Sequence, residues 1–215
     1  MDIGNNLWIA IPILIICSIF YSSHLQKKRY EALKSFFSRL GYQFDQTSNG
    51  LITSQIAHLN LLQRGRRQNL SNVARITIGK NELIYCDFKY TTGHGKRAKT
   101  QRLSLLCIVG QFDLPEFTLE PEGLFSKIAQ SVGYHDIDLE LDPDFSKMFV
   151  LRGVDTQRIK SLFSHDLTHS LKRQPKAKVE GSKGALVYCS TTQIKPVDMR
   201  QWIEETKRVL QSFPV

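Results

Sequence analysis

The sequence lacks the short motifs that mark most catalytic sites. No GxSxG stretch, no GxxxxGK[ST] stretch and no CxxC pair occurs among its 215 residues. Motifs of these kinds position a nucleophile, bind a phosphate or hold zinc. We therefore predict no catalytic residue, no cofactor and no metal ligand from sequence motifs.

Cysteine is scarce as well. The four cysteines are Cys17, Cys86, Cys107 and Cys189, and each lies in an apolar stretch. Their spacing fits no zinc pattern. We interpret them as free thiols in a reducing compartment.

Acidic residues are fewer than basic ones, 20 Asp and Glu against 29 Lys and Arg, and the formal net charge is +9. A surface this positive favours anionic partners. The hydrophobic fraction of 41% is that of a folded chain, and the length suits one domain.

Charge is absent from one long stretch, Ile3 to Tyr21, whose 19 residues would span about 28 Å as a helix. Basic residues follow this stretch, which by the positive-inside rule places the rest of the chain on the cytoplasmic side. We expect a single-pass membrane anchor in residues 1–24 and a cytoplasmic domain in residues 25–215. A cleaved signal peptide would need a basic start, and a lipoprotein a small residue in place of Ile16 before Cys17.

The remainder predicts an α+β domain with helices packed on an antiparallel sheet. Apolar residues at helical spacing predict a helix over Leu25–Leu40, nearly continuous with the anchor. Segment Leu51–Leu62 fits either a helix or a strand. Predicted strands cover Val73–Ile78, Leu83–Tyr90, Arg102–Val109, Glu116–Leu119, Met148–Arg152 and Ala185–Cys189. Predicted helices cover Glu122–Val132, a segment capped by Asp155, His165–Lys172 and a final segment begun by Pro196.

Four phrases of the sequence resemble a known group of proteins. They are YTTGHGKRAKTQ, LPEFTLEPEGLFSKI, DIDLELDPDFSKMFVLRG and the following DTQRIKSLF. This combination resembles a widespread group of uncharacterised bacterial proteins with an N-terminal membrane segment, over about residues 44–213. The resemblance implies a bacterial origin, and with the anchor it implies the inner membrane. It implies no activity.

Three clusters of basic residues are the candidate binding residues. The first follows the anchor, the second lies in a loop predicted over Gln63–Asn69, and the third lies at a predicted hairpin tip over Thr91–Thr100. Their members are Lys27, Lys28, Arg29, Arg64, Arg66, Arg67, Lys96, Arg97 and Lys99. We expect a membrane-tethered, non-catalytic binding or scaffold domain that contacts anionic lipid or an acidic protein.

Two other patterns in the sequence resemble metal-binding patterns only in part. His165 and His169 lie four residues apart, as in zinc proteases, but no third ligand accompanies them. Acidic residues alternate from Asp136 to Asp144, but the calcium-loop glycine is missing, so an edge strand is the better interpretation. A hydrolase with an unidentified site and a nucleic-acid-binding module are the alternative functions. Nucleic acid is not the expected partner, because no fold signature interleaves the basic loops with aromatics.

Overall fold

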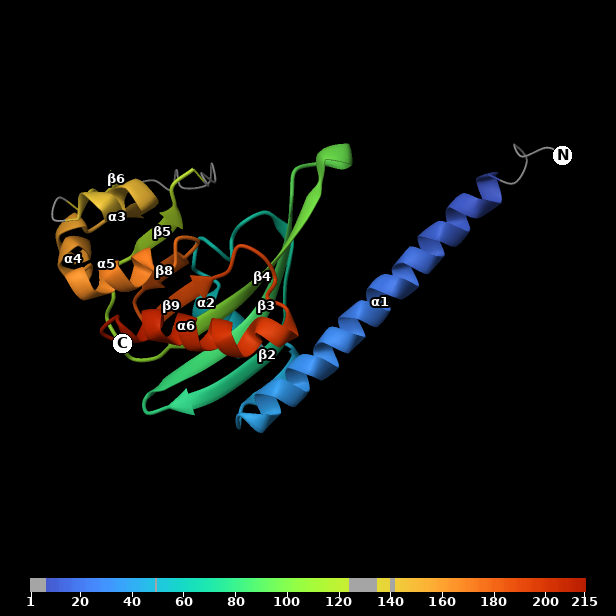
Figure 1. Cartoon of the computed structure of the whole chain (residues 1–215), viewed down its shortest axis with the longest axis horizontal. Coiled ribbons are helices and arrows are strands. Elements are labelled where there is room, and N and C mark those ends of the chain that lie inside the picture. The colour runs from blue at the N-terminus through green and yellow to red at the C-terminus, as the bar shows by residue number, and fades with distance from the viewer. Residues whose placement is uncertain (1–6, 49, 124–134, 140–141) are drawn as a thin grey trace.

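The computed structural model describes residues 7–48, 50–123, 135–139 and 142–215, with only the backbone described for residues 7–10 and 51–53. Its centre is a nine-stranded sheet in which every pairing is antiparallel. Helices lie against this sheet, so the α+β prediction is confirmed (Figure 1). The strands are β1 (Gln43–Thr47), β2 (Arg66–Ile78), β3 (Asn81–Thr92), β4 (Lys99–Val109), β5 (Phe117–Pro121), β6 (His135–Asp136), β7 (Phe149–Gly153), β8 (Lys178–Ser182) and β9 (Ala185–Cys189).

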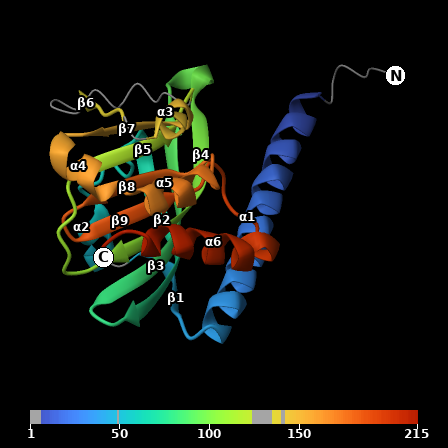
Figure 2. The ribbon, with the colours of Figure 1, turned by 60° about the vertical axis from the view of Figure 1, so that its left-hand side comes forward.

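The helices differ greatly in length, and α1 is by far the longest. They are α1 (Leu7–Arg39), α2 (Gly50–Ile56), α3 (Pro143–Met148), α4 (Thr156–Leu162), α5 (His165–Lys172), α6 (Met199–Gln211) and the 3-10 turns η2 (Gly95–Arg97) and η3 (Pro196–Asp198). The C-terminal half of α1 lies beside the sheet, and its N-terminal half extends away from the domain (Figures 1 and 2).

The sheet consists of two parts joined side by side. Strands β1 to β4 form a meander, and the full order is β1-β2-β3-β4-β9-β8-β5-β7-β6. The first part has the long strands, because β2, β3 and β4 each span 11 to 13 residues. Since β9 pairs only with Leu105–Val109 of β4, the other ends of β2, β3 and β4 extend beyond the second part as a narrow ribbon.

Hydrophobic residues cover both faces of the sheet. One core contains Leu33 and Phe37 of α1 and Ile203 of α6, which pack on one face together with α3, α4 and α5. The other core lies under segment 56–62, beside α2. Every residue of β3 from Leu83 to Phe88 is buried because both faces are covered. Such a strand has a continuous apolar pattern instead of an alternating one.

Most of the predicted elements are present. Strand β9 and helix α5 have the predicted bounds, and the predicted helix over Leu25–Leu40 is the C-terminal half of α1. The predicted loop over Gln63–Asn69 is wrong in part, because β2 begins at Arg66. Strand β8 was missed, since its residues form a charged stretch with a glycine. The predicted helix Glu122–Val132 falls almost wholly on residues that lie outside the described ones.

The transmembrane prediction is overturned. Across the described residues, no helix combines the length and the apolar character that a membrane crossing requires. The single-pass anchor and the inner-membrane localisation are therefore wrong.

Candidate anion-binding ribbon

The structure separates the nine predicted basic residues into three environments. Lys27 and Lys28 are exposed on α1. Arg29 and Arg64 are largely buried and paired with carboxylates, as described below. The remaining residues are exposed at one end of β2, β3 and β4. They are Arg66, Arg67, Lys96, Arg97 and Lys99.

Arg29 fastens α1 to the sheet. Its Nε lies 2.8 Å from Oδ2 of Asp87 and its Nη2 lies 2.8 Å from Oδ1, so the pair is bidentate. Its Nη1 donates to the carbonyl oxygen of Ile194 at 2.6 Å. The Arg29 side chain is 10% exposed and that of Asp87 is 4% exposed. We call this pair the clamp, and it leaves Arg29 without a free face for an external anion.

Other polar groups complete the clamp around Asp87. Tyr85 Oη donates to Asp87 Oδ1 at 2.6 Å, and Asn72 Nδ2 donates to Oδ2 at 2.9 Å. Burial raises the pKa of Tyr85 well above its ordinary value, and the Asp87 charge raises it further. Burial acts to lower the pKa of Arg29, but the hydrogen bonds to Asp87 and Tyr85 and the charges of these two groups together outweigh it, and the pKa is raised. Both groups therefore keep their protons, and the clamp is a structural ion pair.

Arg64 has a similar role on the opposite face of the sheet. Its Nη2 pairs with Glu120, and both side chains are less than one tenth exposed. Beside it, Glu180 accepts hydrogen bonds from the backbone N–H of Asn60 at 2.6 Å and of Leu61 at 2.8 Å. Burial raises the pKa of Glu180, and these two hydrogen bonds oppose that rise. The contacts hold segment 58–64 on the sheet, so Arg64 is also structural.

The exposed cations gather where β2, β3 and β4 extend past the rest of the sheet. Arg66 pairs in register with Thr91, and Thr92 pairs with Lys99, so the two predicted loops lie side by side. Figure 1 shows the hairpin tip standing clear of the helices. The turn requires glycine, because Gly93 has φ +69° and a Cβ there would lie 2.5 Å from the carbonyl oxygen of Arg97.

We call this end of the three strands the basic ribbon. It comprises residues 66–70 and 88–103, and neither segment contains an acidic residue. Its exposed cations are Arg66, Arg67, Lys89, Lys96, Arg97, Lys99 and Arg102. Its aromatic side chains, Phe88 and Tyr90, are buried and stacked on each other. The ribbon thus presents cations and the exposed imidazole of His94, and it has no exposed Phe, Tyr or Trp ring.

Lys89 and Arg102 were missed in the sequence analysis. They are direct cross-strand partners in the β3–β4 register. Like charges directly opposite each other in a sheet destabilise it. Their positions at equal distances from the hairpin turn are the signal that could have paired them.

The other candidate groups, as the structure describes them, do not assemble a metal site. The His165 and His169 rings are exposed and stacked, with centroids 6.4 Å apart. Asp142 instead caps α3 and binds Lys172 Nζ at 2.8 Å and Thr168 Oγ1 at 2.9 Å. Among the residues the structure describes, no three His, Cys, Asp or Glu side chains are grouped to hold a metal ion. Cys86, Cys107 and Cys189 are free and buried.

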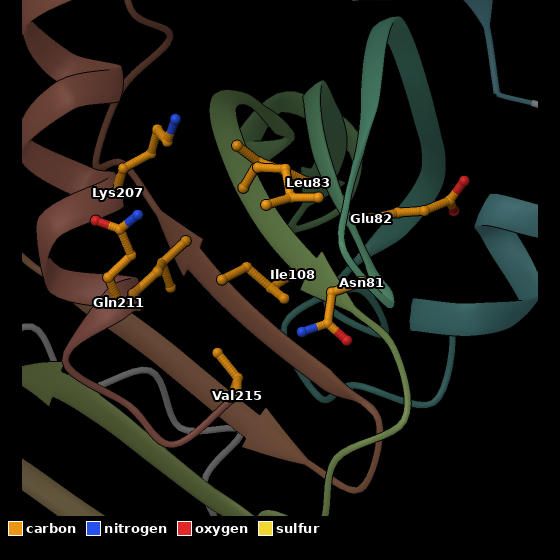
Figure 3. Close-up of a pocket in the computed structure, with 9 residues that line it drawn as sticks. Asn81, Glu82, Leu83, Ile108, Lys207, Gln211 and Val215 are labelled. Atoms are coloured by element: carbon orange, nitrogen blue, oxygen red, sulfur yellow. The ribbon is translucent and has the colours of Figure 1, made fainter.

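A hollow of about 240 Å³ lies at the opposite end of the long strands, between the C-terminal end of α6 and the β2–β3 hairpin (Figure 3). Its walls are largely aliphatic, with Leu83, Ile108 and Val215 directed into it and Lys207 at its rim. None of the predicted basic residues lines it. It is small beside typical ligand pockets of roughly 300–1,000 Å³.

Comparison with known proteins finds similarity of fold and no similarity of sequence. The chain matches no protein-family model and no curated protein sequence. A solved structure, that of the mycobacterial trehalose monomycolate transport factor A, TtfA, is similar with a TM-score of 0.59 and 7% sequence identity. The match covers 86% of this chain and 96% of that chain. It shows a shared fold, and the resemblance to an uncharacterised bacterial group stays a prediction.

Proposed function

We propose that this protein is a non-catalytic binding or scaffold domain that uses the basic ribbon to contact an acidic protein partner. The observation that carries the proposal is the ribbon itself, where seven exposed cations lie on three paired strands and on the turn that joins two of them, without an acidic residue among them. An anionic partner would be attracted by the combined field of these cations. It would also relieve the repulsion between Lys89 and Arg102.

The ribbon favours an acidic protein over the other anions. Surfaces that bind single-stranded nucleic acid stack bases on several exposed aromatic rings, but Phe88 and Tyr90 are buried and the ribbon exposes only the His94 ring. Lipid headgroups attract polybasic segments whatever their conformation. The strands instead hold Lys89, Lys99 and Arg102 in a fixed register, which suits a partner whose carboxylates also have fixed positions. Anionic lipid, left open by the sequence, becomes one arm of the test.

The structural neighbour is named as a transport factor, and a binding role is compatible with that name. Arg29 and Arg64 are not part of the proposed binding surface, because their carboxylate partners hold them inside the domain. Lys27 and Lys28 lie on α1, outside the ribbon.

The test compares two variants with the same loss of charge. The ribbon variant replaces Lys96, Arg97 and Lys99 with Gln, and the control replaces the exposed residues Arg173, Lys176 and Lys183 with Gln. Binding to fluorescent poly-L-glutamate, anionic phospholipid vesicles and single-stranded RNA is measured over a range of salt concentrations.

We expect the ribbon variant to bind poly-L-glutamate roughly tenfold more weakly than the control, because exposed charge pairs contribute about 0.2–1 kcal/mol each. Equal binding by the two variants would refute the proposal. Tighter binding to vesicles or to RNA than to poly-L-glutamate would assign the ribbon to lipid or to nucleic acid instead.

A further inference from the structure

The outer edge of β4 within the ribbon has unpaired backbone groups. Strand β9 pairs with β4 from Leu105 to Val109, and Ser190 extends the contact to Ser104. The described part of the chain places no further strand beside Lys99–Leu103. This segment is therefore a sheet edge.

The direction of each backbone group follows from the neighbouring contacts. The N–H of Ser104 donates to Ser190 Oγ at 2.8 Å, and its carbonyl oxygen accepts from the N–H of Ser190 at 2.9 Å, so both groups point outward from β3. In an antiparallel strand alternate residues point their backbone groups to the same side. Thr100 and Arg102 therefore also present outward N–H and C=O groups, and neither has a partner for them among the described residues.

The two edges of the ribbon differ in regularity. Along β4 the register with β3 is continuous over eleven pairs, from Lys99 to Val109. Along β2 the register shifts between Arg66 and Asn69, and Arg67 has φ +53°. An irregular edge is less suited to pairing with an added strand than a regular edge. Only β4 offers a straight row of backbone groups.

We infer that the outer edge of β4, residues Lys99–Leu103, binds an extended acidic segment of the partner as an added β-strand. Main-chain hydrogen bonds to Thr100 and Arg102 would supply the pairing, as in other β-strand additions. Lys89 and Arg102, which share one face, would meet the acidic side chains. This inference rests on the proposed function, because the partner meets the same ribbon.

Charge also argues for an acidic strand over a second copy of this chain. Two copies paired edge to edge would bring Lys99 and Arg102 of each copy together. Cations on an edge strand are a known means of preventing such self-pairing. An added strand with acidic side chains would instead be attracted by Lys99 and Arg102.

The test separates backbone pairing from charge. Thr100→Pro removes one outward N–H and keeps every cation, and proline is tolerated on an edge strand. Thr100→Ala is the matched control, because it loses the same side chain but keeps the N–H. The probe is a fluorescein-labelled octapeptide of alternating Glu and Val, titrated into the full chain at low salt.

We expect the Pro variant to bind about tenfold more weakly than the Ala variant, since it loses a hydrogen bond and places a ring against the added strand. Equal binding by the two variants would overturn the added strand, and so would failure of the wild-type chain to bind the octapeptide. In either case the proposed function stands if poly-L-glutamate binding still depends on Lys96, Arg97 and Lys99, and falls if it does not.

A second measurement uses only the wild-type chain, so that it tests the inference even if the Thr100→Pro variant does not fold. Amide hydrogen exchange of the wild-type chain is compared with and without the octapeptide. The amides of Thr100 and Arg102 should gain protection on binding, while those of the β2 edge should not. Unchanged exchange at Thr100 and Arg102 would overturn the inference.

Discussion

Strand β3 has two charged residues on the same face, Asp87 and Lys89, and the environments of these two side chains are opposite. Asp87 is buried and neutralised by Arg29, with further hydrogen bonds from Tyr85 and Asn72. Lys89, two residues along, is exposed and lies opposite a second cation, Arg102. The comparison shows that one strand contains both a satisfied ion pair that supports the fold and an unsatisfied charge pair that is available to a partner.

The pair of Asp142 and Lys172 is intermediate. Their side chains are 13% and 27% exposed, and Asp142 also caps α3. Pairs that are more buried cost more when one partner is removed, since a charge is left without solvent. The three pairs therefore form a graded series, and each can be tested by a substitution.

The largest effect is expected at the clamp. Asp87→Ala would leave the Arg29 guanidinium largely buried without its carboxylate and would also remove the acceptor of Tyr85 and Asn72. Removing one partner of a buried ion pair typically costs about 3–5 kcal/mol. Urea unfolding followed by circular dichroism should show a loss of this size in the free energy of unfolding.

Arg66→Ala is the control for the clamp, because Arg66 is an exposed cation of the ribbon. Its effect on the free energy of unfolding should stay within about 0.5 kcal/mol. Similar losses for Asp87→Ala and Arg66→Ala would show that the clamp contributes no more than a surface charge, and the division into two regions would fail.

A smaller effect is expected for Asp142→Ala. The change removes a helix cap and a partly buried ion pair, which together contribute about 1–2 kcal/mol at pH 7. Hydrogen bonding to Lys172, followed by that of Thr168, lowers the pKa of Asp142. A lowered pKa stabilises the folded state above the ordinary range of aspartate, and this stability is lost as the pH falls through the folded-state value. The difference between wild type and variant should therefore shrink in acid. A difference that stays constant down to about pH 2 would contradict it.

The sequence predicted the part of the fold that depends on local patterns. Strand β9 and helix α5 follow from an apolar run and from helical spacing. Strand β8 could not be found in this way, because its acidic residue Glu180 is buried only through contacts with distant segments, such as its hydrogen bond from the backbone N–H of Asn60. The transmembrane prediction counted an apolar run, and the described part of the helix does not sustain one long enough.

The candidate site was predictable only in part. The sequence shows where the basic residues are, but it does not show which of them form ion pairs inside the fold. Arg29 meets Asp87 from 58 residues away, and Arg64 meets Glu120 from 56 residues away. Conversely, the two basic loops became one ribbon only through the register of β2 with β3. Long-range pairing decided both outcomes, and it is not encoded in any local pattern.

The smallest effect is expected at the ribbon, and its sign is opposite to that at the clamp. Lys89→Glu should stabilise the fold by about 0.5–1 kcal/mol, because a cross-strand repulsion with Arg102 becomes an attraction. The same change should weaken binding to poly-L-glutamate, because it places an acid among the cations. Lys89→Gln should give about half the gain in stability, since it removes the repulsion without adding the attraction. Thermal unfolding and the binding titration, performed on the same samples, measure both effects. If the Lys89→Glu variant is less stable and binds poly-L-glutamate equally well, the opposed cations neither destabilise the fold nor contribute to binding. The contrast between Asp87 and Lys89 would then be one of burial alone.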